Sequence, residues 1–275
     1  MKYLRRRLAH GILLLIGASV LCFLFTALAP GSFFDEIKLN PQISPETVAA
    51  LRSHYGLDQP TPVRYVRWVE SVFKGEWGYS FAYNSPVKGL LVVRARNTLL
   101  LTGVATLLVW LMAVPLGIWI ADHPGRWSDR LCMGGTSVLL SVPELVLALG
   151  FLCLAVRTHA LPVGGMASVG FDQLGRWSML RDLVTHLIIP VITLVLAGLP
   201  VLLRHVRASM TEVMKAPFIH AARGHGVSNA RLLFRYALPA AANPLISLFG
   251  FSVGGLLSGS LLVEVVAVDP RVRMQ

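Results

Sequence analysis

His205, His220 and His225 lie in one part of the chain and are the first side chains to consider for metal binding or proton transfer. Two histidines that share a metal on one helix are four residues apart, so that both project from the same face. The spacing here is 15 and then 5 residues, which fits no helical metal face. No HExxH pair and no serine–histidine dyad is recognisable either, so the sequence favours neither a metalloenzyme nor a hydrolase.

Nucleotide and cysteine motifs are also absent from the sequence. No glycine-rich phosphate loop ending in Lys followed by Ser or Thr occurs, and the chain is therefore not expected to hydrolyse ATP itself. Cys22, Cys132 and Cys153 fall within apolar runs and show no CxxC or Cys/His ligand spacing. We therefore expect no disulfide, no metal and no cofactor bound by this chain.

The composition indicates which class of protein positions these residues. Of the 275 residues 55% are hydrophobic and 14% are charged, and the mean hydropathy is +0.64, whereas soluble domains carry about 25% charged residues. A helix needs about 20 apolar residues to cross a hydrocarbon core about 30 Å thick. Five runs meet this length, at about 9–29, 98–121, 131–156, 183–203 and 241–266. The sequence therefore predicts an all-α integral membrane protein.

The first apolar run has two interpretations. Its basic start is typical of a cleaved signal peptide, and TALAPGS loosely matches a cleavage site. The run from Gly11 to Leu28 is longer than the about 7 to 15 apolar residues of a signal peptide, which favours an uncleaved membrane helix.

Basic residues at the ends of the apolar runs predict the orientation of the chain. Short loops rich in Lys and Arg stay in the cytoplasm. The start of the chain, the loop 122–130 and the segment 204–240 all fall on one side, and the last carries six basic residues against the single acid Glu212. We therefore expect a cytoplasmic N-terminus, and we attribute the net charge of +11 to topology rather than to nucleic-acid binding.

The same orientation places 30–97 and 157–182 outside the cell. In the first of these, Ser44 and Glu46 could open one helix, and Pro60 and Pro62 could start another, with Val63, Val66, Val69, Val72 and Phe73 on one side. The predicted organisation is a start and first span (1–29), an outer helical cap (30–97), spans two to four (98–203), a cytoplasmic segment (204–240) and a fifth span with the C-terminus (241–275).

The cytoplasmic segment contains a helix that a glycine elbow separates from a second helix. Pro217 suits the first turn of a helix that runs to Arg223, where Gly224 and Gly226 stop it. Ser228 or Asn229 could cap the second helix, from Ala230 to Ala237, which should end before Pro239. The first helix carries an apolar face of Phe218, Ile219 and Ala222. It is too short to be stable alone, so it must lie on anionic lipid headgroups or on a partner protein.

The spacing within this segment resembles a known motif. AARGHG, with Ala221, Ala222 and Gly226, is followed nine residues later by YALP. This is similar to the EAA loop of the permease subunits of binding-protein-dependent ABC importers, in which Glu-Ala-Ala, three residues, Gly and nine residues precede Ile-x-Leu-Pro. Leu238 and Pro239 match the end of the motif, whereas His220 replaces its Glu and Tyr236 its Ile.

Further segments resemble the first-permease type of the dipeptide, oligopeptide and nickel branch of that family. These are FLFTALAPGS, HYGLDQPTPVRYVRWV, GEWGYSF, RNTLLLT, VPLGIWIA, LSVP, LPVGG and RASMTEVM, in the family's order. The resemblance implies a type I ABC importer fold with six spans in the bacterial inner membrane. It implies four kinds of partner: a second homologous permease, two cytoplasmic ATP-binding subunits that hydrolyse ATP with Mg, an extracytoplasmic solute-binding protein and the lipid bilayer.

In that family the EAA loop docks as a coupling helix on the ATPase. The residues that this implies for ATPase coupling here are Phe218, Ile219, His220, Ala221, Ala222, Arg223, Gly226, Leu238 and Pro239. Arg223 could reach an acidic ATPase surface. For the glycines, helix termination alone is the simpler alternative.

Glu144 lies about 13 residues into the third predicted span, where an unpaired acid is costly. Either it lines the translocation path, or it is an interior polar group that Ser137 or Ser141 satisfies. Pro115, Pro143 and Pro190 could mark bends in the spans, although packing among the helices explains them equally well.

The chain departs from the family pattern at its end. After LLVEVVAVDPRVRMQ no sixth span follows, so five spans are expected here and the C-terminus should lie outside. The sequence therefore leaves two functions open. The chain is either the permease subunit of an ATP-driven importer for peptides or related small solutes, or a shortened subunit that does not transport and only assembles with, or regulates, a partner permease.

Overall fold

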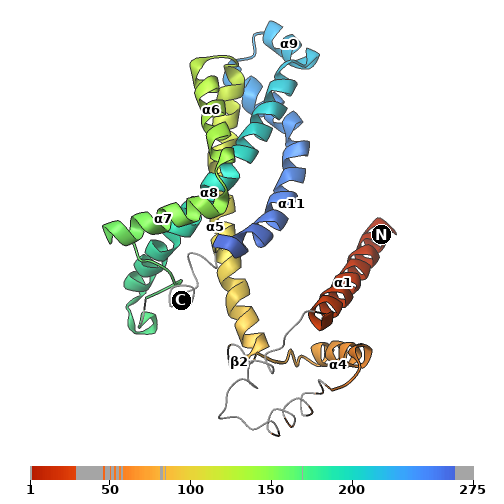
Figure 1. Cartoon of the computed structure of the whole chain (residues 1–275). Coiled ribbons are helices and arrows are strands. Elements are labelled where there is room, and N and C mark those ends of the chain that lie inside the picture. Colours follow the sequence, from red (N-terminus) through yellow and green to blue (C-terminus); the bar gives the residue numbers. More distant parts are fainter. Residues whose placement is uncertain are drawn as a thin grey trace. The chain divides into compact units, whose positions relative to one another are not determined.

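A computed structural model describes residues 2–28, 46, 50, 53, 56, 58–80, 83, 85–168 and 170–263 (Figure 1). Its contacts divide the chain into two units, Met1–Val93 and Arg94–Gln275. Helices make up nearly all of the described residues, as the composition predicts. The described strands are the short antiparallel pair β1 (Tyr79–Ser80) and β2 (Ser85–Pro86), in which Tyr79 lies opposite Pro86.

The first unit contains the predicted first span and one outer helix. The first span forms α1 (Lys2–Leu28), none of whose residues is buried. The helix expected at Pro60 and Pro62 forms α4 (Thr61–Phe73), and Pro62 lies in its first turn, where the missing N–H is not needed. Most of the helix expected to begin at Ser44 lies outside the described residues.

The second unit is built on long helices that continue beyond the predicted spans. The second span lies within α5 (Val87–Asp122), whose first seven residues belong to the first unit, and the fourth lies within α8 (Arg176–Met214). At about 1.5 Å per residue, helices of 36 and 39 residues measure more than 50 Å, well over the thickness of a bilayer core. Pro115 and Pro190 lie inside these two helices without interrupting them.

The third predicted span, 131–156, is wrong as a single helix. Its residues form α6 (Trp127–Ser141) and α7 (Glu144–Thr158), which meet at 90° (Figure 1). The break falls at Val142 and Pro143. A proline has no N–H to donate and disfavours a helical conformation in the residue before it, and Val142 is accordingly extended, with φ −96° and ψ 118°. Of the three prolines considered in the sequence, Pro143 is the one that lies at a break.

The remaining elements are η1 (Phe171–Gln173), α9 (Pro217–Gly224), α10 (Asn229–Arg231), the π-helical segment η2 (Leu232–Ala237) and α11 (Leu238–Val263). Within the described residues, four helices are long and apolar enough to cross a membrane, or five if α6 and α7 together form one span. The predicted count of five agrees with this result. Residues 264–275, within the segment LLVEVVAVDPRVRMQ after which the departure from the family pattern was expected, lie outside the described residues.

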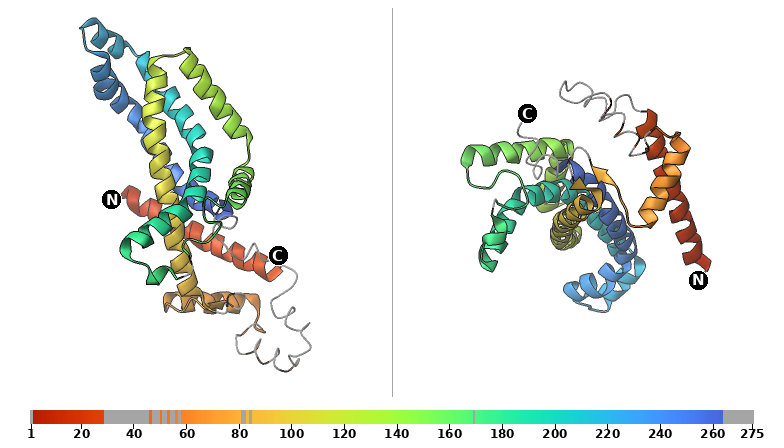
Figure 2. Two further views of the ribbon diagram at one scale, coloured as in Figure 1. Left: turned by 90° about the vertical axis from the view of Figure 1, so that its left-hand side faces the viewer. Right: turned by 90° about the horizontal axis from the view of Figure 1, so that it is seen from below.

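The core of the second unit lies between α5, α8 and α11. Leu101, Ala105 and Val109 of α5 are buried, as are Leu202 and Val206 of α8 and Ala241 and Leu245 of α11. Figure 2 shows α5 and α8 running side by side. The two helices approach closely at Gly117, where an added Cβ would lie 2.5 Å from Cγ1 of Val206. A glycine is therefore needed for α8 to lie this close to α5.

Candidate functional site

The cytoplasmic segment predicted at 204–240 contains the expected helix and glycine elbow. Ala216 is the N-cap of α9, Pro217 lies in the first turn, and Gly226 takes a left-handed conformation with φ +78°. The Val227 amide donates to the Ala222 carbonyl and the Gly226 amide to the Arg223 carbonyl, which together form a Schellman motif. Gly226 alone is the terminating glycine, since Gly224 is the last residue of α9 rather than part of the stop.

The second helix begins at the expected place but does not end before Pro239. Ser228 is the N-cap residue of α10, without a side-chain capping bond, and the helix continues through η2 into α11. Within η2 the Leu238 amide donates to the carbonyl of Leu233, five residues earlier. Proline cannot donate, and its ring collides with the carbonyl four residues before it, so the wider π turn lets the helix continue through Pro239.

The three residues of the predicted apolar face of α9 differ in their surroundings. Ile219 is 0% exposed and belongs to the core of the second unit, and Ala222 packs against the same core. Phe218 is 48% exposed, and His220, Ala221 and Arg223 are also exposed. One side of α9 is therefore anchored to the chain's own core, and the rest of its surface carries an exposed aromatic residue and an exposed arginine.

The two remaining residues implied for coupling differ in exposure. Leu238 is half-buried against the core, whereas Pro239 is exposed. Figure 1 shows that α9 and the start of α6 lie at the same end of the second unit.

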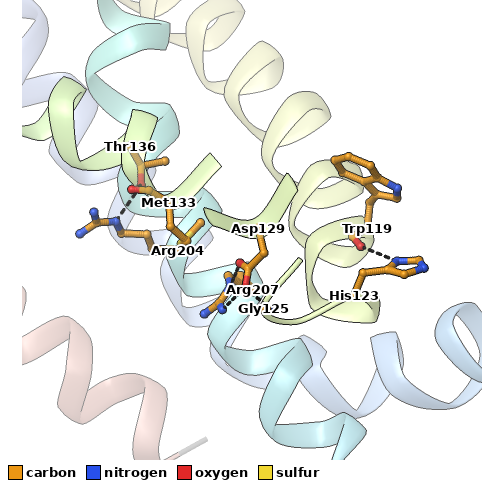
Figure 3. Close-up of polar contacts among 8 residues, drawn as sticks. All are labelled: Trp119, His123, Gly125, Asp129, Met133, Thr136, Arg204 and Arg207. Atoms are coloured by element: carbon orange, nitrogen blue, oxygen red, sulfur yellow. Dashed lines mark hydrogen bonds and ion pairs between the residues drawn. The ribbon is translucent and has the colours of Figure 1, made fainter. Parts of the chain in front are cut away.

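An ion pair joins α6 to α8 at this end. The Asp129 carboxylate accepts hydrogen bonds from Nε of Arg207 at 2.6 Å, from Nη2 of Arg207 at 2.7 Å and from the Gly125 amide at 2.8 Å (Figure 3). Asp129 is 4% exposed, so its charge depends on these three donors. We call this group, Asp129 with Arg207 and the Gly125 amide, the α6–α8 clasp.

Two further polar contacts lie around the clasp. On α8, Nε of Arg204 donates to Oγ1 of Thr136 at 3.0 Å, and its Nη2 donates to Oγ of Ser137 at 2.6 Å. After α9 in the chain, at the start of α10, Nδ2 of Asn229 donates to Oδ2 of Asp122 at 2.7 Å. The corner between α5 and α6 is thus bonded both to the helix before α9 and to the helix after it.

The sequence reasoning missed the clasp. Asp129 and Arg207 are 78 residues apart, and only the placement of their segments on the same side of the membrane related them. The available signal was the presence of two acids, Asp122 and Asp129, in the short loop 122–130, because carboxylates are strong hydrogen-bond acceptors for arginine side chains.

Glu144 does not lie in the middle of a continuous span. It is the first residue of α7, directly after the 90° break, which corrects the expectation drawn from the sequence. Its Oε1 is buried and has no hydrogen-bond partner among the described residues. Ser137 donates to the Met133 carbonyl and Ser141 to the Ser137 carbonyl, so neither serine has the partner expected of it.

The histidines and acids do not assemble a metal site within the described residues, where no three His, Cys, Asp or Glu side chains come together. Nδ1 of His205 lies 2.7 Å from the Val201 carbonyl on its own helix.

Comparison with known proteins relates the whole chain to transport proteins. Residues 113–274 match the family described as "Binding-protein-dependent transport system inner membrane component", and residues 1–102 match the N-terminal domain of such membrane components. The oligopeptide transport system permease protein AppB of Bacillus subtilis (strain 168) is 29% identical over 98% of this chain and 84% of its own length.

Two further relatives carry names with different solutes. The glutathione transport system permease protein GsiC of Salmonella paratyphi A is 32% identical, over 97% of this chain and 82% of its own length. The probable D,D-dipeptide transport system permease protein DdpB of Escherichia coli (strain K12) is also 32% identical, over 97% and 83%. These matches confirm the resemblance seen in the motifs, and they identify a multi-pass membrane protein that is a transport subunit rather than an enzyme. The chain belongs to the family of inner membrane components of binding-protein-dependent transport systems, in the branch of the peptide permeases.

Proposed function

We propose that this chain forms half of the translocation pathway of an ATP-driven importer of peptides or related small solutes. In this proposal it lies in a bacterial inner membrane with its N-terminus in the cytoplasm. It assembles with a second homologous permease and two cytoplasmic ATP-binding subunits, which hydrolyse ATP with Mg. An extracytoplasmic solute-binding protein delivers the solute. The chain itself binds no cofactor, metal or nucleic acid.

The observation that carries the proposal is the two-sided environment of α9. Ile219 is buried in the core of the second unit, whereas Phe218 is half-exposed, and His220, Ala221 and Arg223 of the same short helix are exposed as well. An exposed aromatic residue with basic neighbours fits an apolar groove with an acidic rim, and aromatic anchors of this kind contribute most to protein interfaces. The ATPase would hold Phe218 while Ile219 transmits the displacement to the core.

Two routes carry this displacement from α9 to the spans. α8 ends at Met214, three residues before α9, and α10 continues through η2 into α11 without an interruption. The α6–α8 clasp and the Asn229–Asp122 contact bond both routes to the corner between α5 and α6. Displacement of α9 would therefore move α5, α6, α8 and α11 together, because only short links join α9 to its neighbours and hydrogen bonds or a continuous helix join the helices beyond those links.

Glu144 is the residue we propose for the translocation path. Its carboxylate lies at a corner where the backbone also leaves the helical pattern, and a charged side chain in a membrane segment is most often directed toward a water-filled path or a partner. A carboxylate there could meet the ammonium group of a peptide as it passes.

The test is reconstitution of the chain with its partner permease, ATPases and binding protein in vesicles. Phe218→Ala should weaken the association with the ATPase about 10- to 30-fold, as loss of an aromatic anchor does, and it should abolish solute-stimulated ATP hydrolysis. Phe25→Ala is the matched control, because Phe25 is an exposed phenylalanine on α1, far from α9 in the sequence.

Two outcomes would contradict the proposal. If Phe218→Ala and Phe25→Ala behave alike, α9 is not the coupling helix. If the wild-type chain assembles but hydrolysis never drives uptake, the chain is a non-transporting subunit that assembles with or regulates another permease.

A further inference from the structure

The outer helix α4 makes a specific contact with α1. Phe23 of α1 packs edge-on against Tyr65, with ring centroids 5.5 Å apart, and lies 6.3 Å from Trp68. The Tyr65 hydroxyl and the Ser19 hydroxyl are 2.8 Å apart and share a hydrogen bond. The Arg64 guanidinium lies 5.7 Å from the Phe23 ring centre. These five side chains determine where along α1 the helix α4 lies.

The contact lies close to the C-terminal end of α1. Phe23 lies five residues before the last residue of α1, Leu28, which is about 7.5 Å at 1.5 Å per residue. Since α1 is an apolar helix long enough to cross the membrane, its end marks the neighbourhood of the bilayer surface. Helices that lie in a membrane surface enter it by about 5 to 10 Å. The depth of Phe23 falls within that range.

α4 also carries more apolar surface than α1 covers. Tyr65, Trp68 and Val72 recur at helical spacing on the side that meets α1. A second stripe beside it, with the spacing i, i+4, i+7 and i+11, consists of Pro62, Val66, Val69 and Phe73. In this stripe Val66 is 55% exposed and Phe73 is 87% exposed.

The opposite side of α4 carries charged residues together with Val63, which is exposed and does not share the face of Val66 and Val69 that the sequence predicted. Arg67 and Glu70 are exposed, and Lys74 follows the last residue of the helix. Together with Arg64, which lies over the Phe23 ring on the side that meets α1, the helix and the residue after it carry three basic residues against one acid, a balance that suits anionic headgroups.

We propose that α4 is an interfacial helix whose Pro62, Val66, Val69 and Phe73 stripe enters the headgroup and acyl-chain boundary of the leaflet around the C-terminal end of α1. The occupant is lipid because the stripe continues the surface of α1, a helix with no buried residue that crosses the same bilayer. Arg67 and Lys74 lie at the level of the phosphates. α4 thereby sets the depth of α1, since Tyr65 and Trp68 hold Phe23 at the boundary. This inference does not depend on coupling to an ATPase.

The test compares the two faces of α4 in the full chain. In a variant without Cys22, Cys132 and Cys153, single cysteines replace Val66 or Phe73 in the stripe and Arg67 or Glu70 on the polar face. Each is labelled with an environment-sensitive fluorophore. The protein is placed in vesicles of phosphatidylethanolamine and phosphatidylglycerol, with nitroxide-labelled lipids as quenchers.

Labels at 66 and 73 should be quenched several-fold more by lipids with a shallow nitroxide than labels at 67 and 70, and aqueous iodide should show the reverse order. Equal iodide quenching at all four positions would overturn the proposal. So would protection of positions 66 and 73 that appears only after the solute-binding protein is added, because that protein would then be the occupant.

A second experiment avoids the cysteine replacements. Benzoylphenylalanine at position 66 or 73 of the otherwise native chain should form adducts with lipid on irradiation, whereas the same residue at 67 or 70 should not. Adducts with protein alone at 66 and 73, identified by mass, would contradict the lipid assignment.

Discussion

The α6–α8 clasp and the α1–α4 contact hold helices together in different ways. In the clasp, a carboxylate that is almost fully buried accepts three hydrogen bonds, two of them from one guanidinium. In the α1–α4 contact, aromatic rings pack on one another around a single pair of hydroxyl groups, and Trp68 stays exposed. A bidentate ion pair defines distance and angle, whereas ring packing tolerates rotation and sliding. The clasp therefore suits transmission of movement, and the aromatic contact suits control of depth.

The largest effect should come from breaking the clasp on one side. Arg207→Met leaves the Asp129 charge buried without its partner, which typically costs about 3 to 5 kcal/mol of unfolding free energy. Denaturant unfolding in lipid nanodiscs measures the loss. Arg130→Met is the control, because Arg130 is exposed and neighbours Asp129 in sequence.

A double variant shows whether the charge or the shape of the clasp matters. Arg207→Met with Asp129→Leu removes both charges, and unfolding stability should return close to the wild-type value. If the double variant is as unstable as Arg207→Met, an uncompensated carboxylate is not the cause. Both variants lack the bond between α6 and α8. Coupling of ATP hydrolysis to uptake should therefore be reduced in the double variant as well as in Arg207→Met, even though the double variant is stable.

An intermediate effect is expected at the elbow after α9. Gly226 has φ +78°, and an added Cβ would meet no atom within 4 Å, so Gly226→Ala should cost about 1 to 2 kcal/mol from the backbone conformation alone. Gly224→Ala is the matched control, because Gly224 is helical and equally unobstructed. Alanine favours a helix over glycine, so the control should be neutral or slightly stabilising. Equal losses in the two variants, measured by unfolding, would show that the left-handed turn does not form.

The smallest effect belongs to the α1–α4 contact. Tyr65→Phe removes the hydrogen bond to Ser19 and keeps the ring, so the loss should be about 0.5 to 1.5 kcal/mol. The readout is hydrogen exchange of α4 amides in nanodiscs, with Tyr3→Phe as the control on α1. A loss as large as that of Arg207→Met would remove the distinction between the two contacts.

The local features of the coupling segment could be predicted from the sequence. Pro217 and Gly226 act through their own backbone preferences, so the start of α9 and the elbow followed from residue type. The burial of Ile219 could not be predicted, because an eight-residue helix with apolar residues on two sides does not indicate which side faces the core. The partner of Asp129 depends on the packing of α6 against α8, which a pattern along the chain does not contain.

The 90° break between α6 and α7 was missed for a different reason. Average hydropathy over a window of about 20 residues treats Val142 and Pro143 as two apolar residues among many, although one proline ends a helix. The continuation through Pro239 is the opposite case, in which a π turn accommodates the proline and the helix does not end. The effect of a proline thus depends on the turn before it, which the residue types alone do not reveal.

The corner between α6 and α7 limits where these helices can lie. A chain that turns inside a membrane leaves carbonyl groups near the turn without helical donors, and acyl chains offer none. At about 1.5 Å per residue, the 15 residues of α7 reach only about 22 Å, too short to cross the bilayer alone. The Glu144 carboxylate lies at this turn too, because Glu144 is the first residue of α7. Water or another protein surface must therefore solvate this turn, and hydrocarbon cannot surround it on all sides.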